Sequence, residues 1–227
     1  MKIFSITCTR DKNLSEGAKA LFSTLSSYGV HVKVLANQTS IFEAYKKGLE
    51  ACDAGPDDII IFCHDDIEIL SSKAEFVGSL SQAVAQTVGI IGLAGTTELG
   101  ENAVWWDQTK WREGKHRGRV LHREPQVHST EYGACGRVVA MDGLFLAARR
   151  AVWEMVGLEK PKHFKGDWDF YDIHYTTRAH LLGYNNYTVP IEVIHDSSGE
   201  LVGRDSWHLN REAFINNTKL PLCLFGS

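Results

Sequence analysis

The feature that most constrains the fold is the run Ile-Ile-Ile-Phe-Cys at residues 59–63, which follows the turn sequence Gly-Pro-Asp-Asp. A short run that is rich in β-branched residues and free of polar side chains is typical of a central strand buried on both faces. Before residue 96, further expected strands (2–8, 31–35 and 88–94) alternate with expected helices (14–28, 40–52 and 73–86). The sequence therefore predicts an α/β fold with a mostly parallel central sheet flanked by helices.

The alternation stops between residues 96 and 133, a segment rich in Trp, Gly and basic residues. It is too long for an ordinary connection, so we expect a flexible loop with some hairpin content that acts as a binding lid. After it we expect strand structure at 137–148, interrupted at Asp142-Gly143, a strand at 187–194, and helices at 150–156, 171–182 and 206–216. Because the chain shows no internal repeat and no linker, we expect one domain over residues 1–227.

Charge and composition exclude several classes of protein. The net charge of −4 argues against non-specific nucleic-acid binding, which needs a strong basic excess. Five cysteines without a CxxC pair indicate neither a disulfide framework nor a cysteine zinc site. No apolar run approaches the roughly 18 residues that span a bilayer, and the first residues lack a secretory signal pattern. We therefore expect a cytoplasmic protein with no transmembrane segment and no nucleic-acid partner; peripheral membrane association stays open.

Residues 110–123 contain six Lys and Arg residues and two His residues, close to Trp105, Trp106 and Trp111. Arginine side chains match phosphate oxygens and indole faces cover sugar rings, so this stretch suits phosphate or sugar contacts. The alternative is a solvated surface loop.

Acidic residues follow the buried strand at 59–63, in the order His64, Asp65, Asp66 and, a turn later, Glu68. In open α/β sheets ligands bind beyond the carboxyl ends of the strands. Carboxylates at that edge suit a hard divalent cation that also holds substrate phosphates. The alternative is that Asp65 and Asp66 only cap the segment that follows.

Two further clusters lie at the ends of expected elements. Three aspartates and His174 surround the start of the helix at 171–182, where a carboxylate can act as a general base or can simply favour the helix dipole. His195 follows the last strand and can complete a metal site with Asp66, or can be a structural histidine. The functional interpretation depends on all three clusters meeting at one edge of the sheet. The motifs GxGxxG, GxxxxGK[ST], GxSxG and HExxH are absent, which argues against dehydrogenases, P-loop kinases, serine hydrolases and zinc proteases.

Together these residues resemble the glycosyltransferase family 2-like enzymes, which have the GT-A (Rossmann-like) fold, and are similar to the StrF-type transferases. The resemblance depends on the order and spacing of residues 7–10, Asn37, 61–67, 141–145, 170–174 with Arg178 and Gly183-Tyr184, and 195–197. It implies a nucleotide-binding half at 1–95 and an acceptor half at 134–227. The implied activity is metal-dependent, inverting, hexosyltransferase-type transfer from a nucleotide-diphosphate sugar, with UDP-sugar as the default, to a saccharide or lipid-linked acceptor.

The resemblance also assigns roles to single residues. Asp66 and His195 would bind Mn²⁺ or Mg²⁺, and Asp172 would be the general base. The expected donor-binding residues are Thr7, Thr9 and Asn37 at the nucleoside, Asp65 in the DxD-like segment, and Asp142 and Gly143 beside the transferred sugar.

The chain departs from the family pattern at His64, where relatives carry the first aspartate of DxD, at His174, where a second acidic residue is common, and at Lys46, where asparagine is frequent. One alternative is therefore a degenerate protein that binds nucleotide sugars without efficient turnover. Another is a metal-dependent phosphoester hydrolase that uses His64, Asp65, Asp66 and His195.

Overall fold

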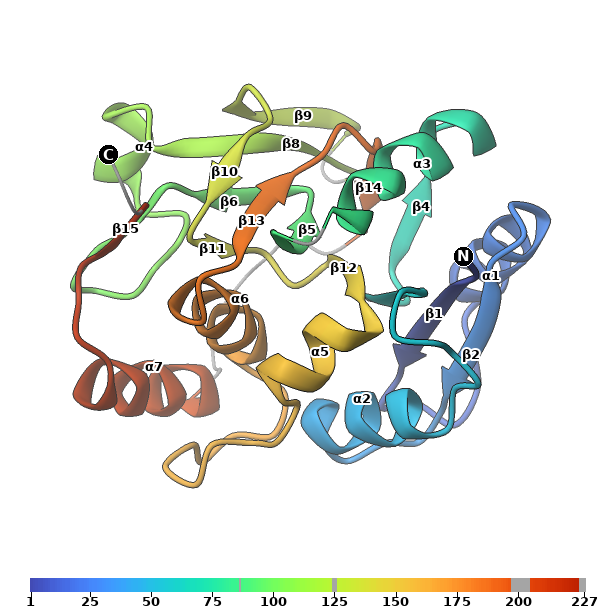
Figure 1. Cartoon of the computed structure of the whole chain (residues 1–227), viewed down its shortest axis with the longest axis horizontal. Coiled ribbons are helices and arrows are strands. Elements are labelled where there is room, and N and C mark those ends of the chain that lie inside the picture. Colours follow the sequence, from blue (N-terminus) through green and yellow to red (C-terminus); the bar gives the residue numbers. More distant parts are fainter. Residues whose placement is uncertain (86, 124–125, 197–204, 225–227) are drawn as a thin grey trace.

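A seven-stranded sheet forms the centre of the computed structural model, which describes residues 1–85, 87–123, 126–196 and 205–224. Its strand order is β10-β13-β5-β12-β3-β1-β2 (Figure 1). The bounds are β1 Ile3–Cys8, β2 His31–Leu35, β3 Ile59–Cys63, β5 Val88–Gly92, β10 Arg137–Val138, β12 Phe145–Arg149 and β13 Asn185–Thr188. As the run of apolar residues predicted, β3 is buried along its whole length and lies between β1 and β12.

The predicted α/β class with helices around a central sheet is confirmed, but the sheet is mixed rather than mostly parallel. Strand β1 pairs with β2 and β3 in parallel, and β13 pairs with β5 in parallel. Strand β12 runs antiparallel to both β3 and β5, and β10 runs antiparallel to β13. The chain enters β12 from the turn at Asp142-Gly143 without a crossover helix, so it arrives from the carboxyl-end edge and runs backwards. A strand that is buried at every position has the same apolar pattern whether it runs parallel or antiparallel to its neighbours. The sequence pattern therefore could not show that β12 is antiparallel.

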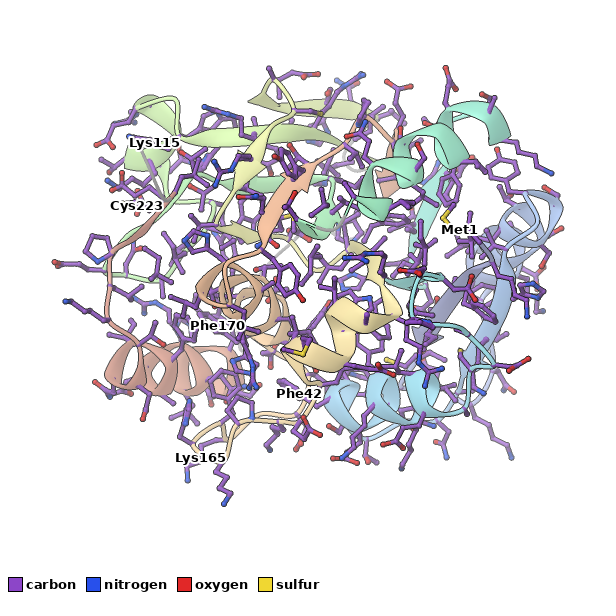
Figure 2. All side chains as sticks on the ribbon, in the orientation of Figure 1. Met1, Phe42, Lys115, Lys165, Phe170 and Cys223 are labelled. Atoms are coloured by element: carbon purple, nitrogen blue, oxygen red, sulfur yellow. The ribbon has the colours of Figure 1, made fainter. Side chains whose placement is uncertain are left out.

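Helices flank this sheet, at α1 Glu16–Ser27, α2 Ile41–Glu50, α3 Lys73–Leu80 with the 3₁₀ turn η1 Ser81–Val84, α5 Arg150–Val156 and α6 Tyr171–Leu181. A further helix, α7 Asp205–Asn217, packs through Trp207 and Phe214 against Phe170, which precedes α6. Helices α1, α2 and α3 begin at serines 15, 40 and 72, whose hydroxyls accept the backbone N–H three residues on. Gly48 lets α2 approach β1, because a Cβ there would lie 2.4 Å from Ile6 Cγ2. Phe42, which Figure 2 labels, lies at the end of α2 that is nearer to α6, and its ring packs edge-on against Tyr175 of α6 with centroids 5.9 Å apart.

A second, six-stranded sheet crosses one end of the first, in the order β11-β6-β8-β14-β4 with β9 paired to β8. Its strands are β4 Ile67–Ile69, β6 Ala94–Thr96, β8 His116–His122, β9 His128–Gly133, β11 Ala140–Met141 and β14 Val193–His195. The short strands β7 Glu98–Leu99 and β15 Leu222–Cys223 pair with each other, and α4 spans Gln108–Arg112. The hairpin content expected within 96–133 is confirmed by β8 and β9, but an irregular loop is wrong for most of this segment. Only Val120 is aliphatic among the buried positions of β8, so the strand pattern is hidden in the sequence.

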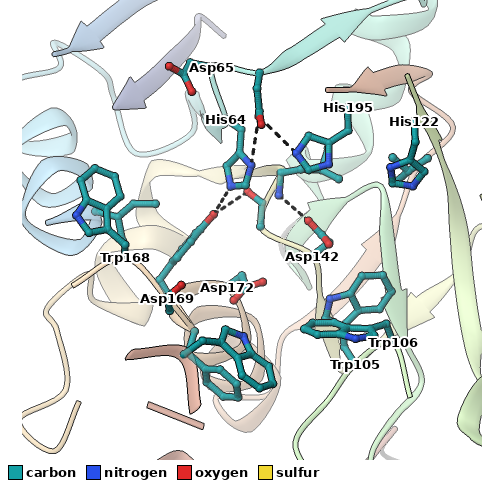
Figure 3. Close-up of a pocket in the computed structure, with 18 of the residues that line it drawn as sticks. His64, Asp65, Trp105, Trp106, His122, Asp142, Trp168, Asp169, Asp172 and His195 are labelled. Carbon is teal, nitrogen blue, oxygen red and sulfur yellow. Dashed lines mark hydrogen bonds and ion pairs between the residues drawn. The ribbon is translucent and has the colours of Figure 1, made fainter. Parts of the chain in front are cut away.

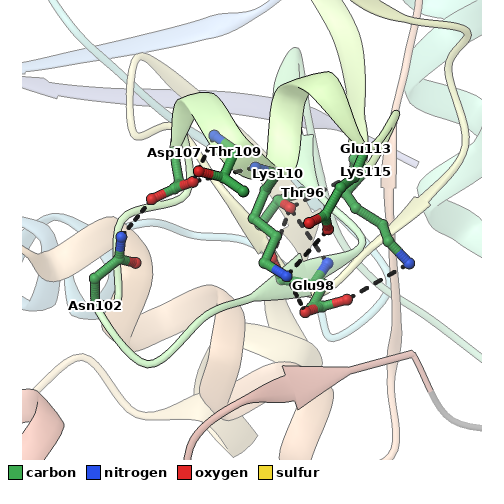
Figure 4. Close-up of polar contacts among 8 residues, drawn as sticks. All are labelled: Thr96, Glu98, Asn102, Asp107, Thr109, Lys110, Glu113 and Lys115. Atoms are coloured by element: carbon green, nitrogen blue, oxygen red, sulfur yellow. Dashed lines mark hydrogen bonds and ion pairs between the residues drawn. The ribbon is translucent and has the colours of Figure 1, made fainter.

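Ion pairs fix the start of this second sheet (Figure 4). Lys110 Nζ lies 2.5 Å from Glu98 Oε1 and 3.1 Å from Glu113 Oε2, and Lys115 Nζ lies 3.5 Å from Glu98 Oε2. Asp107 caps α4 by accepting the backbone N–H groups of Thr109 and Lys110. These contacts hold the Trp105-Trp106 segment against the body of the protein.

The buried apolar residues of both sheets and the covering helices form one hydrophobic cluster. Within the described ranges, no helix combines the length and apolar character needed to cross a bilayer.

Candidate functional site

A cavity of about 850 Å³ opens where the carboxyl ends of β1 and β3 meet the second sheet (Figure 3). Its lining comes from the segments after β1, β3 and β14, from the turn between β11 and β12, and from the start of α6. The three clusters singled out in the sequence therefore meet in one place. The predicted site residues that line the cavity are Thr9, Asp65, Asp66, Asp142, Gly143, Asp172 and His195.

His64, Asp66 and His195 form a group of potential metal ligands, whose ligand atoms all lie within 4.8 Å of one another. Asp66 Oδ1 is 3.6 Å from His64 Nδ1 and 3.4 Å from His195 Nε2. These separations are long for hydrogen bonds, and they are close to the spacing of two atoms that share one cation at about 2.1 Å. Asp66 Oδ1 and His195 Nε2 are buried, and neither has a hydrogen-bond partner among the described residues. The residues present therefore fit a divalent cation.

Backbone pairing brings these side chains together. Strand β14 runs antiparallel to β4 with His195 opposite Ile67, so His195 lies next to Asp66, the residue that precedes β4. The Asp196 N–H also donates to the Asp66 carbonyl at 2.9 Å. Arg123 spans the same junction, with 2.6 Å contacts to both Glu68 and Asp196. The position of His195 beside Asp66 is thus set by sheet register rather than by side-chain packing alone.

Tyr171 orients His64. Its hydroxyl donates to the Gly143 carbonyl at 3.1 Å and lies 2.7 Å from His64 Nε2. A hydroxyl has one hydrogen, so the contact to His64 requires the ring to donate from Nε2, which leaves the Nδ1 lone pair facing Asp66. Burial lowers the pKa of His64, which favours this neutral form. A neutral imidazole with a free Nδ1 lone pair is the state that binds a metal.

Asp66 and His195 influence each other. Burial acts to raise the pKa of Asp66, but its contact with His195 and the neighbouring imidazoles hold the pKa below the ordinary value. Burial acts to lower the pKa of His195, but Asp66 raises it. Asp66 is therefore an ionised carboxylate, and His195 binds a proton more strongly than an ordinary imidazole does.

We expect Tyr171→Phe to weaken Mn²⁺ binding by about 10-fold, because the hydroxyl that accepts from His64 Nε2 and fixes the His64 tautomer is lost. Tyr175→Phe is the matched control. Tyr175 lies one turn further along the same helix, and its hydroxyl donates to the Leu158 carbonyl rather than to His64. Titration of Mn²⁺ into both variants by electron paramagnetic resonance measures the effect. Equal affinities in the two variants would contradict the orienting role.

Asp172 lies at the entrance of α6, directly against the turn at Asp142-Gly143. Burial and the negative charge of Asp142 raise the pKa of Asp172 to about 7. Gly143 permits this approach, because a Cβ there would lie 2.3 Å from the Tyr171 hydroxyl and 2.9 Å from Asp172 Cβ. Phe170, which precedes the helix, adopts a left-handed backbone with φ of 69°, a conformation that costs energy in a residue other than glycine. The helix start is therefore shaped by local strain that aims Asp172 into the cavity.

Asp167 and Asp169, the other aspartates of this acidic cluster, have partners of their own, although Asp169 also lines the cavity. Asp167 pairs with Lys160 at 3.0 Å, and Asp169 accepts the Ser206 hydroxyl at 2.5 Å. His174 is half-buried, and burial lowers its pKa to about 4, so its imidazole is neutral near pH 7. It is not among the residues that line the cavity.

Of the three residues expected at the nucleoside, only Thr9 reaches the cavity. Thr7 is fully buried in β1 with its hydroxyl 3.1 Å from Cys63 Sγ, and Asn37, with φ of 56°, donates its backbone N–H to the Asp11 carbonyl. Sequence reasoning missed Arg10 and Trp168, which line the cavity with the Arg10 guanidinium 4.5 Å above the indole ring. The signal available for Arg10 was its position one residue after Thr9, at the end of β1.

None of the six Lys and Arg residues of 110–123 lines the cavity, although His122 does. Acidic neighbours bind several of them instead: Glu98 pairs with Lys110 and Lys115, Glu131 and Glu192 pair with Arg119, and Glu68 and Asp196 pair with Arg123. Trp105, Trp106 and Trp111 do line the cavity.

Residues 4–214 match the model of a glycosyltransferase-like family. A197 from STIV has a similar structure, with a TM-score of 0.52, 12% identity, and 87% of each chain covered. GalNAc-T7, in a crystal structure with UDP, GalNAc and Mn²⁺, gives a TM-score of 0.54 and 13% identity over 91% of this chain and 45% of its own. The present chain thus spans less than half the length of that protein. A search of curated proteins finds no significant match.

The likeness to these two structures shows a shared fold and agrees with the predicted GT-A fold. The match to the family model extends over most of the chain and includes all the segments that line the cavity. The protein therefore belongs to this glycosyltransferase-like family.

Proposed function

We propose that the protein is a metal-dependent, inverting glycosyltransferase that moves a hexose from a UDP-sugar to a saccharide or lipid-linked acceptor. One observation carries the proposal: Asp66 Oδ1 and His195 Nε2 are buried, have no hydrogen-bond partner among the described residues, and lie in the same cavity as Asp172. GalNAc-T7, which shares the fold, is seen with UDP and Mn²⁺, and this supports the choice of donor and cation.

In this proposal His64, Asp66 and His195 hold the cation. Two imidazoles and one carboxylate suit Mn²⁺ better than Mg²⁺, because Mg²⁺ prefers oxygen ligands and water. When bound, the cation neutralises the charge that develops on the leaving nucleotide diphosphate. Thr9, Arg10 and Asp65 line the part of the cavity beyond β1 and β3 that would receive the nucleotide, and Asp142 and Gly143 would adjoin the transferred sugar.

Asp172 would accept the proton of the acceptor hydroxyl. The hydroxyl oxygen then bonds to the anomeric carbon as the bond from that carbon to the diphosphate oxygen breaks, and the diphosphate departs with the electron pair. Displacement in one step inverts the anomeric configuration. Because the pKa of Asp172 is about 7, the base form increases as the pH rises through 7, and the rate of transfer should rise with it.

Analysis of the product anomer tests the mechanism. We expect the protein, incubated with Mn²⁺ and a panel of UDP-α-sugars, to release UDP and to give the β-configured product first, whether an added saccharide or water accepts the sugar. Proton nuclear magnetic resonance of the reaction distinguishes the anomers before mutarotation. Initial formation of the α-anomer would contradict direct displacement, and cleavage of simple phosphoesters without any sugar donor would favour a metallohydrolase.

The raised pKa of Asp172 also predicts a pH-dependent cost in stability. An unfolded aspartate ionises near pH 4, whereas folded Asp172 stays protonated until about pH 7, so stability falls as the pH rises between these values. Asp172→Asn removes this cost. We therefore expect the variant to melt at about 5 °C above the wild type at pH 8 and at nearly the same temperature at pH 4, as measured by calorimetry. An equal or lower melting temperature of the variant at pH 8 would show that the buried charge of Asp172 does not destabilise the folded protein.

A further inference from the structure

One side of the cavity is a continuous surface of aromatic rings. It consists of Phe170, Trp207, Trp106, Trp105, Tyr132 and Trp111, and we call it the aromatic wall. Successive ring centroids along this order are 5.7, 5.7, 5.7, 5.2 and 5.2 Å apart. The wall begins two residues before Asp172. In Figure 3, Trp105 and Trp106 lie on the opposite side of Asp172 from Trp168.

Trp105 carries a buried polar group that has no partner in the part of the chain that the structure describes. The residue is 2% exposed, and its indole Nε1 is buried without a hydrogen-bond partner among the described residues. An indole nitrogen can only donate, and a buried donor without a partner is energetically unfavourable. Since Trp105 lines the cavity, a ligand that brings an acceptor oxygen to this nitrogen would recover that energy.

The chemistry of the wall distinguishes between possible ligands. A lipid chain would cover the rings but would leave the Trp105 N–H unpaired. A sugar ring presents a C–H face that can lie on an indole and hydroxyl oxygens that can accept from its N–H. Gln108, His128 and Thr130 also line the cavity and add polar groups near the wall. Trp106, Trp111 and Tyr132 are the partly exposed rings of the wall, and together they are wider than a single sugar ring.

We propose that the aromatic wall is the acceptor subsite and that it binds an oligosaccharide rather than a lipid chain. Its placement relative to the reaction rests on the proposed function, because Asp172 would then lie between a donor bound at His64, Asp66 and His195 and an acceptor bound on the wall. The terminal sugar would place its hydroxyl at Asp172 while the preceding sugars lie along Trp207, Trp106 and Trp105.

The proposal is tested on an array that carries immobilised oligosaccharides and, as lipid probes, immobilised prenyl phosphates. Tagged protein is applied to the array in the presence of UDP and Mn²⁺. Two variants separate the contributions of the wall: Trp106→Ala removes a ring face, and Trp105→Phe keeps a ring but removes the N–H. We expect the wild type to bind a subset of the oligosaccharides and both variants to bind them about 10-fold more weakly. Tyr187→Ala, which removes a partly buried aromatic side chain from a strand outside the cavity lining, is the matched control and should change oligosaccharide binding by less than about 2-fold.

Calorimetric titration of the same variants with UDP and Mn²⁺ completes the test, and we expect unchanged affinity in Trp105→Phe and Trp106→Ala. The acceptor subsite is refuted if the wild type binds no oligosaccharide, if it binds only prenyl phosphates, or if the wall variants lose UDP instead. Should Trp106→Ala fail to fold, Trp105→Phe alone decides, because it preserves an aromatic ring of similar shape. Oligosaccharide binding in a protein that never binds UDP would support the saccharide surface and contradict the proposed glycosyl transfer, so the two failures can be told apart.

Discussion

Asp172→Asn should lower the rate of sugar transfer by about 1,000-fold while leaving the affinity for nucleotide and Mn²⁺ within about 2-fold of the wild type. Asparagine has the same shape as aspartate but cannot accept the proton of the acceptor hydroxyl. Asp172 lies in the cavity with its pKa raised to about 7, which suits a base that works near neutral pH. Initial rates at saturating donor, together with calorimetric titration of UDP, measure the two quantities.

Asp167→Asn is the matched control, because Asp167 belongs to the same acidic cluster but pairs with Lys160 and does not line the cavity. This control should retain nearly full activity. An unchanged rate in Asp172→Asn would refute its role as base. A wild-type protein that binds UDP and Mn²⁺ but transfers no sugar to any acceptor or to water would instead indicate a degenerate binding protein.

Asp66→Ala should weaken Mn²⁺ binding by at least about 100-fold, because it removes the carboxylate that lies between His64 and His195 and leaves two imidazoles without a shared anion. Binding of UDP in the presence of Mn²⁺ should fall to the level seen with a chelator. Electron paramagnetic resonance of free Mn²⁺ gives the first quantity and calorimetry gives the second.

Glu68→Gln provides the comparison for this prediction. Glu68 is a carboxylate two residues further along the chain, and it pairs with Arg123 rather than with the two histidines. We expect its Mn²⁺ affinity to match the wild type within about 3-fold. Equal Mn²⁺ affinity in Asp66→Ala and Glu68→Gln would contradict the assignment of Asp66 as a metal ligand.

The sequence pattern predicted the elements that carry strong local signals. The expected helix at 150–156 and the expected strands at 31–35 and 59–63 coincide with α5, β2 and β3. The expected strand at 88–94 is instead two strands, β5 and β6, that belong to different sheets. Nothing local marks this division, because both strands are fully buried and the change of sheet depends on distant pairing with β12 and β8.

The site was predictable where residues follow a strand directly. His64, Asp65, Asp66 and His195 were expected at strand ends and line the cavity. Thr7 was expected to contact the donor, but alternation along β1 turns its side chain toward Cys63 inside the core.

The contributions of Tyr171, and of Trp207 to the aromatic wall, could not be predicted from the sequence. Tyr171 reaches His64 across 107 residues of sequence, and Trp207 reaches Trp106 from the other end of the chain. Each of these contacts depends on how α6, α7 and the second sheet pack together.

The most direct test of the metal-dependent donor site is calorimetric titration of the wild-type protein with UDP, GDP and their sugars, each with Mn²⁺ and with a chelator. We predict saturable binding of the UDP series that requires Mn²⁺ and is lost with the chelator. The absence of binding to any of these nucleotides by the folded protein, or binding that is equally strong without a metal, would contradict the role assigned to His64, Asp66 and His195.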